Sequence, residues 1–183
     1  MIIGLTGTNG AGKGALVDYL VQKKGFTHYS GRALITEEIE KRGLLVDRSS
    51  MRIVANDLRA TLGPAYIAET YYNRAIGSGH DAVIESIRAL KEAEFLKEKG
   101  AYIFAVDADR RIRYERIVRR GSTTDKVDFD TWVIQEEREW GNSEAYDMNV
   151  PAVMQMADFT FQNNGTPEEL HARVDKVLQQ IKK

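Results

Sequence analysis

Short apolar runs alternate with helical patterns along the whole chain. Residues 2–6 form an apolar run bounded by glycines, which is typical of a buried parallel strand. Further strands are predicted at residues 26–29, 82–84, 102–106 and 159–161. Strands that alternate with helices predict an α/β fold, with a five-stranded parallel sheet and helices on both of its faces. Ligands of such sheets bind at the carboxyl ends of the strands.

Helical spacing of apolar residues fills most of the intervals between these strands. Helices are predicted at residues 12–24, 33–43, 49–62, 65–76, 90–99, 109–120, 129–140 and 167–181. The last begins with a capping box, because Thr166 is followed three residues later by Glu169. Residues 31–78 contain helices without a strand, so we expect a helical part beside the sheet. A length of 183 residues fits a single domain, residues 1–183.

The composition excludes several kinds of binding partner and of active-site chemistry. The chain has 26 Lys and Arg against 27 Asp and Glu, a formal net charge of −1, and so lacks the overall field that would hold a nucleic acid. It contains no cysteine, which excludes thiol nucleophiles, iron–sulfur clusters and disulfides and fits a reducing compartment. No apolar run reaches the roughly 18 residues of a membrane helix. We expect a cytoplasmic protein that binds neither nucleic acid nor membrane, of open oligomeric state.

A glycine-rich loop links the first predicted strand to the first predicted helix. It fits G-x-x-x-x-G-K, the phosphate-binding loop (P-loop), in the strand–loop–helix context that this motif requires. Glycines let successive N–H groups surround a phosphate, the helix N-terminus attracts negative charge, and the lysine adds a cation. The alternative is a flexible turn with a surface lysine. The residues predicted to bind ATP here are Gly7, Thr8, Asn9, Gly10, Ala11, Gly12, Lys13, Gly14 and Ala15.

The end of this loop departs from the common motif. Gly14 stands where a serine or threonine usually binds Mg²⁺, and Ala15 also lacks a hydroxyl, so Mg²⁺ would be held by phosphates, water and a carboxylate. Glu85 ends the third predicted strand and is expected to point into the phosphate site, as a metal ligand or as the acceptor of the substrate's proton. Arg88 is placed to hold an acceptor phosphate. The alternative is that Glu85 pairs structurally with Arg88 or Lys13.

Six arginines lie within eleven residues of one predicted helix. Arg113, Arg116 and Arg120 share one face of it, and a polar stretch follows. Because phosphoryl transfer depends on cations that stabilise the charge of the moving group, Arg116 and Arg120 are predicted to be catalytic, beside a lid at residues 119–128. The alternative is a solvated helix face that pairs with the acidic run at residues 136–139.

Several segments resemble known families of P-loop kinases. The loop at residues 7–14 resembles that of nucleoside monophosphate kinases, and residues 82–96 resemble a segment, I-D-G-I-R followed by two glutamates, of an uncharacterised archaeal family of P-loop kinase-like proteins. Residues 157–170 resemble the C-terminal segment of dephospho-coenzyme A kinases, and residues 113–121 are similar to the helix and lid start of both groups. The likeness extends to kinase-like domains attached to some deoxycytidylate deaminases.

The resemblance implies roles for further residues. Residues 29–32 are similar to the S-T-G-D turn that opens the acceptor subdomain of adenylate kinases, although Ile35 stands near the position of an expected arginine. The resemblance of this turn implies that residues 31–78 bind the acceptor. Where the families usually have Asp and Gly, this chain has Glu85 and Ser86. The resemblance implies Ser30 for the acceptor and Asn164 and Gly165 for the adenine edge. The candidates to replace the missing arginine are Arg32 or the later Arg52, Asn56 and Arg59, and Arg88 joins the acceptor site by its position after Glu85.

Together, motif and resemblance predict an ATP-dependent kinase of a nucleoside or deoxynucleoside monophosphate, with Mg²⁺ as cofactor. The expected fold is a three-layer P-loop NTPase with a helical acceptor-binding insertion and a short lid. Lys13, Glu85, Arg116 and Arg120 form the predicted catalytic set. A dephospho-coenzyme A kinase is one alternative, which the C-terminal likeness favours. A regulatory module that binds a nucleotide and transfers nothing is another, because the P-loop hydroxyl is missing.

Overall fold

A five-stranded parallel sheet forms the centre of the protein in the computed structural model, which describes residues 1–121, 127–137, 140 and 147–182. The strand order is β2-β3-β1-β4-β5. The strands are β1 (Ile2–Gly7), β2 (Thr27–Ser30), β3 (Ala82–Glu85), β4 (Tyr102–Asp107) and β5 (Phe159–Gln162). Leu5 lies beside Glu85 and Gly7 beside Val106, so the P-loop begins between the ends of β3 and β4.

Helices link the strands in the described part of the chain, close to the predicted ranges. They are α1 (Lys13–Lys24), α2 (Gly31–Lys41), α3 (Arg48–Leu62), α4 (Tyr66–Ser78), α5 (Leu90–Glu98), α6 (Arg110–Arg120), α7 (Phe129–Glu137), α8 (Val150–Gln155) and α9 (Pro167–Ile181). The short helix α8 was not predicted. The predicted helix at 129–140 is described as far as Glu137, and residues 138–139 lie outside the description. None of the described helices is long and apolar enough to cross a membrane.

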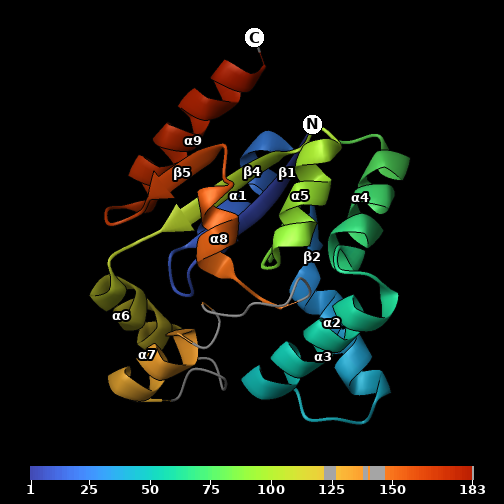
Figure 1. Cartoon of the computed structure of the whole chain (residues 1–183). Coiled ribbons are helices and arrows are strands. Elements are labelled where there is room, and N and C mark those ends of the chain that lie inside the picture. Colours follow the sequence, from blue (N-terminus) through green and yellow to red (C-terminus); the bar gives the residue numbers. More distant parts are fainter. Residues whose placement is uncertain (122–126, 138–139, 141–146, 183) are drawn as a thin grey trace.

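Each face of the sheet is covered by its own set of helices. Successive strand residues point to opposite faces, so Ile3 and Leu5 of β1 pack with α1 and α9, whereas Ile2 packs with α2 to α5 and α8. Figure 1 shows α5 and α8 in front of the sheet and α1 behind it. This arrangement confirms the predicted α/β fold, with helices on both faces of a five-stranded parallel sheet.

The carboxyl ends of the strands share one edge of the sheet. Figure 1 shows that α2 and α3 extend beyond this edge on one side, and α6 and α7 on the other, while both chain termini lie at the opposite edge. The predicted lid at residues 119–128 begins at the end of α6, but residues 122–126 lie outside the description. The P-loop is therefore flanked by two helical pairs that can contribute side chains to one site.

Candidate active site

The P-loop depends on its glycines for its conformation and for its close packing. Gly10 and Gly12 have φ values of 81° and 100°, in the left-handed region that side chains rarely adopt. A Cβ atom on Gly10 would lie 2.4 Å from the carbonyl oxygen of Arg113, and one on Gly12 would lie 2.3 Å from Nδ2 of Asn163. The loop is thus pressed against α6 on one side and against the segment after β5 on the other.

Lys13 places a cation at the N-terminus of α1. Its Nζ atom donates hydrogen bonds to the carbonyl oxygens of Gly7, at 2.9 Å, and Thr8, at 2.7 Å, so the side chain folds back over the loop. The first backbone N–H groups of a helix lack partners within the helix and carry partial positive charge. A cation and a helix N-terminus therefore meet at one place, which suits the phosphates of a nucleotide.

A cavity of about 400 Å³ opens beside the P-loop. Residues of α2, α3 and α6 and of the turn after β3 complete its wall. Among its lining residues in the described chain, Glu85 is the one acidic side chain, against Lys13 and seven arginines. Ile35, Met51 and Ala55 add an apolar surface. The arginines are Arg32, Arg48, Arg52, Arg59, Arg88, Arg116 and Arg120.

The cavity brings together most of the residues predicted for the site. Those that line it are Asn9, Gly10, Gly12, Lys13, Gly14, Ala15, Arg32, Arg59, Glu85, Arg88, Arg116 and Arg120. Those predicted residues that are not among its lining residues are Gly7, Thr8, Ala11, Ser30, Asn164 and Gly165. Ser30 caps α2, because its Oγ atom accepts a hydrogen bond from the N–H of Ala33. Asn164 accepts one from the N–H of Asp109 through its Oδ1 atom.

Glu85 ends β3, as predicted, and it lines the cavity. Its Oε2 atom lies 3.1 Å from Nε2 of His28 on β2. The hydrogen bond to His28 lowers the pKa of Glu85 below its ordinary value, burial opposes this shift, and the charge of Lys13 adds to it. Glu85 is therefore ionised at neutral pH. An ionised carboxylate can bind a metal ion, and it can also accept a proton from a hydroxyl group.

The residue after Glu85 has an uncommon backbone conformation. Ser86 has a φ of 75°, and it also lines the cavity. The left-handed region costs a residue with a side chain about 1–2 kcal/mol, and such strain is concentrated at functional sites. Here it turns the chain from β3 toward Arg88, which joins the cavity wall.

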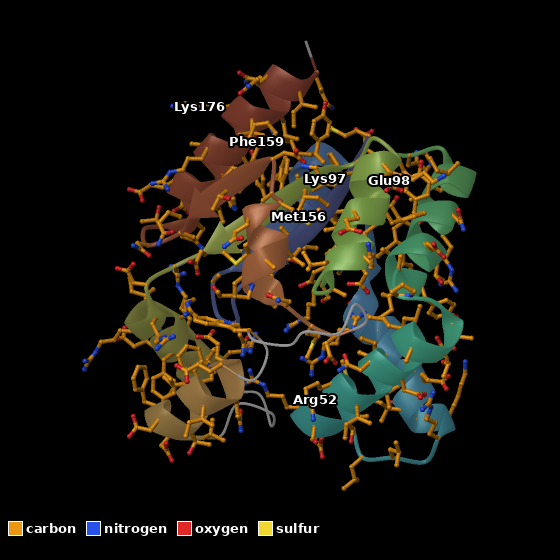
Figure 2. All side chains as sticks on the ribbon, viewed as in Figure 1. Arg52, Lys97, Glu98, Met156, Phe159 and Lys176 are labelled. Carbon is orange, nitrogen blue, oxygen red and sulfur yellow. The ribbon has the colours of Figure 1, made fainter. Side chains whose placement is uncertain are left out.

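The arginines on the helical part differ in how they are held. Arg59 has only 1% of its side chain exposed, and its Nε atom donates a 2.8 Å hydrogen bond to Glu92. Arg48 donates a 3.0 Å hydrogen bond to Oε1 of Gln135 on α7. Within the described residues, Arg32 and Arg52 are exposed and form no hydrogen bond or ion pair. Figure 2 labels Arg52 at the end of α3 that is nearer to α6 and α7.

Arg113 joins α6, α7 and the P-loop. Its guanidinium binds both carboxylate oxygens of Glu136, which lies on α7, and both side chains are at most 4% exposed. It also donates a 3.2 Å hydrogen bond to the carbonyl oxygen of Asn9. Arg113 thus pairs with the acidic run at residues 136–139, as the alternative proposed, but it is buried and does not lie on a solvated face. Trp132 packs against Arg113 and is fully buried.

Asn163 connects the segment after β5 to the P-loop, a contact that the sequence did not reveal. It is 7% exposed, and its Nδ2 atom donates a 2.8 Å hydrogen bond to the carbonyl oxygen of Ala11 in the P-loop. Arg116 donates a 2.9 Å hydrogen bond to the carbonyl oxygen of Asn163, so Arg116 supports the loop and also lines the cavity. The run of two asparagines and a glycine was the available signal, but it does not indicate which asparagine turns inward.

Comparisons with known proteins agree with this architecture. A family model described as an AAA domain matches residues 3–149. A UPF0200 protein of Thermococcus kodakarensis is 33% identical over 99% of this chain and 98% of its own length. The chain belongs to the UPF0200 family. This confirms the predicted membership of an uncharacterised archaeal family of P-loop kinase-like proteins.

Solved structures show which fold this UPF0200 protein shares. The shikimate kinase of Aquifex aeolicus is similar with a TM-score of 0.53 and 16% identity, over 98% of this chain and 97% of that one. A shikimate kinase of Acinetobacter baumannii, in complex with shikimate, reaches a TM-score of 0.60 at 16% identity, over 98% and 92%. At these identities the likeness shows the fold alone. The UPF0200 chain has the α/β P-loop kinase fold.

Proposed function

We propose that this UPF0200 protein is an ATP-dependent phosphotransferase whose acceptor is a nucleoside or deoxynucleoside monophosphate. One observation carries the proposal: a single cavity extends from the P-loop to the arginines of α2, α3 and the turn after β3. Such a cavity can hold the phosphates of a donor and of an acceptor at the same time. In P-loop kinases the catalytic effect comes mainly from positioning these groups and stabilising their charge.

The charge of the cavity supports an acceptor that carries a phosphate. A phosphate monoester has a charge of about −1.5 to −2 at neutral pH. On the acceptor side, Arg32, Arg52 and Arg88 supply cations, and the described lining residues include no acid other than Glu85 that could bind the hydroxyl groups of a polyol. The same fold accommodates shikimate in the Acinetobacter baumannii enzyme, so the fold alone does not define the acceptor. The arginines favour an anionic one.

The need for a base distinguishes two kinds of acceptor. A hydroxyl acceptor, as in a dephospho-coenzyme A kinase, must lose its proton to a base of suitable pKa. The phosphate of a monophosphate is already an anion, so its oxygen can attack the γ-phosphorus without a base, and the bond to the leaving ADP breaks. Glu85 is ionised and can accept that proton, so the hydroxyl acceptor remains the alternative. We place the monophosphate first because its phosphate needs no base and suits the arginines of the cavity.

The residues present fit a bound Mg²⁺ that takes most of its ligands from the donor phosphates and water and few from the protein. Glu85 is ionised and faces the cavity, whereas no group of three or more His, Asp or Glu side chains in the described chain could form a metal cage. Mg²⁺ commonly binds through one or two carboxylates together with substrate phosphates and water. When bound, it would neutralise charge on the donor phosphates. Lys13 and the P-loop N–H groups would hold the same phosphates.

The missing hydroxyl at Gly14 and Ala15 favours a second candidate, a module that binds a nucleotide without transferring its phosphate. The two candidates differ in acceptor-dependent turnover. Release of ADP from Mg·ATP should therefore be measured with each ribo- and deoxynucleoside monophosphate and with dephospho-coenzyme A. The proposal predicts that one monophosphate stimulates release. Tight ATP binding with no stimulation by any compound would support the module instead.

Variants of the proposed catalytic residues test the same reaction. Lys13→Ala and Glu85→Gln should each lower acceptor-dependent turnover by roughly a hundredfold or more, because each removes a group that stabilises charge in the transition state. Lys23→Ala is a matched control, since Lys23 is an exposed residue of the same helix α1 as Lys13. Full activity of Lys13→Ala or Glu85→Gln would remove that residue from the mechanism.

A further inference from the structure

Glu92 is a fully buried carboxylate on α5, behind the wall of the cavity. Its Oε1 atom accepts a 2.8 Å hydrogen bond from Nε of Arg59 on α3. Its Oε2 atom accepts hydrogen bonds from the backbone N–H groups of Arg88, at 3.0 Å, and Ala89, at 3.1 Å. One side chain thus joins helix α3 to the turn that follows β3.

The same polar connection continues on both sides of Glu92. On one side, the Nη1 atom of Arg59 lies 3.5 Å from Oδ1 of Asn56. The side-chain amide of Asn56 in turn donates a hydrogen bond to the carboxylate of Asp147. Beyond the turn, the carbonyl oxygen of Arg88 accepts a 2.8 Å hydrogen bond from the N–H of Asn149. The helical part, α5 and the segment before α8 are therefore linked around the cavity by hydrogen bonds.

Stability alone does not account for a buried pair of this kind. Burying two charges loses their hydration, and apolar side chains of similar volume are often equally stabilising or more so. A buried ion pair does, however, define geometry, because its hydrogen bonds form at particular distances and directions. The pair of Arg59 and Glu92 defines the position of α3 relative to the turn that carries Arg88.

The face of α3 that Arg59 anchors also carries Arg52. Met51, Arg52, Ala55 and Arg59 all line the cavity. Residues seven apart lie two turns apart on the same face of a helix, so an anchor at Arg59 also orients Arg52. Arg52 is exposed and forms no hydrogen bond or ion pair with the described residues.

We propose that Glu92 is a positioning residue for the acceptor: its buried carboxylate sets the separation between Arg52 and Arg88, which together receive the acceptor's phosphate. This inference rests on the proposed function and adds to it the residue that assembles the acceptor site. Glu92 itself is fully buried and touches no substrate. It acts through the helix and the turn that it joins, so its loss should affect the acceptor and spare ATP.

Glu92→Gln tests this role, with Glu94→Gln as the matched control. Glu94 lies on the same helix, but its side chain is 38% exposed and pairs with Lys91. Binding of AMP, GMP, CMP, UMP, dAMP, dGMP, dCMP and dTMP, and separately of ATP, should be measured by calorimetry on the full chain. For the monophosphate that binds the wild type, Glu92→Gln should weaken binding roughly tenfold or more, the effect of one lost charge-assisted hydrogen bond. Glu94→Gln should leave both affinities unchanged.

A purely electrostatic role of Glu92 predicts the opposite sign. Removing a negative charge near an anion site strengthens anion binding if the arginines stay in place. Tighter monophosphate binding by Glu92→Gln would therefore overturn the positioning role, as would equal losses of ATP and monophosphate affinity. Failure of the wild type to bind any of these ribo- and deoxynucleoside monophosphates would overturn it as well. Monophosphate binding without phosphate transfer would instead overturn the proposed function and leave the positioning role standing.

Glu92→Gln leaves Arg59 buried without its counter-ion, and this loss can prevent folding. Glu92→Asp is therefore a second variant, which tests the same role if Glu92→Gln does not fold. Aspartate keeps the charge but is one methylene shorter, so it cannot reach Arg59 and the turn together. The KM for the acceptor should rise roughly tenfold in this variant, whereas the KM for ATP should stay within about twofold of the wild type. An unchanged KM for the acceptor would contradict the role of Glu92.

Discussion

Gly12 and Gly14 lie two residues apart in the P-loop, yet alanine should have opposite effects on stability at the two positions. Gly12 has a φ of 100°, and a Cβ atom there would lie 2.3 Å from Nδ2 of Asn163. That atom already donates a hydrogen bond to the carbonyl oxygen of Ala11. Gly14 lies in the first turn of α1, and a Cβ atom there would have no other atom within 4 Å.

The size of both effects follows from these contacts. In Gly12→Ala, the left-handed backbone costs about 1–2 kcal/mol. Moving Asn163 away leaves a buried polar group without its partner, which costs about 1–3 kcal/mol. The free energy of unfolding should therefore fall by about 2–5 kcal/mol. Gly14→Ala should raise it by up to about 1 kcal/mol, because alanine loses less conformational freedom in a helix than glycine.

Urea unfolding at pH 7, followed by circular dichroism, measures both changes in the absence of any ligand. The denaturant dependence of the free energy should be the same in all three proteins, so that the midpoints report stability. A loss below about 0.5 kcal/mol in Gly12→Ala, within the range of ordinary surface substitutions, would refute the close packing of the P-loop on Asn163. Equal effects of the two substitutions would refute it too.

Two further substitutions test the support of the P-loop and its missing hydroxyl. Glu136→Gln removes the carboxylate that binds the nearly buried Arg113 and leaves it with Asp107, 3.8 Å from its Nε atom, so the free energy of unfolding should fall by about 3 kcal/mol. Glu137→Gln, whose side chain is 56% exposed, should stay within about 0.5 kcal/mol of the wild type in the same urea experiment. Similar losses in both would contradict the role of that pair. Gly14→Ser adds a hydroxyl at the usual Mg²⁺ position in open space, so half-maximal turnover should need less Mg²⁺. An unchanged Mg²⁺ titration would place the metal away from this residue.

The elements of this fold were predictable where they depend on neighbours in sequence. The apolar run of β1, the glycine loop and the helical pattern of α1 follow one another directly, and Glu85 was placed at the site because it ends a buried run. Helix α8 was missed because its six residues are too few for a periodic pattern, although Val150 and Val153 are buried. Its position is determined by packing against β1 and α5, which the local sequence does not show.

The contacts that build the site were harder to predict because their partners are distant in the chain. Glu92 lies in a charged helical segment that is typical of a solvent-exposed face, yet it is buried by its pairing with Arg59, 33 residues away. Asn163 reaches the P-loop over 152 residues. Local spacing indicated which residues could carry chemistry, while their burial and partners depend on the order of the strands.

The most direct test of the account is to identify the compound that gains the phosphate of ATP. The pure protein should be incubated with Mg·ATP and each nucleoside monophosphate, and the products identified and quantified by mass spectrometry, with Lys13→Ala as the control. We expect a nucleoside diphosphate in the same amount as the ADP released, and none in the control. ADP and inorganic phosphate without any newly phosphorylated compound would contradict it.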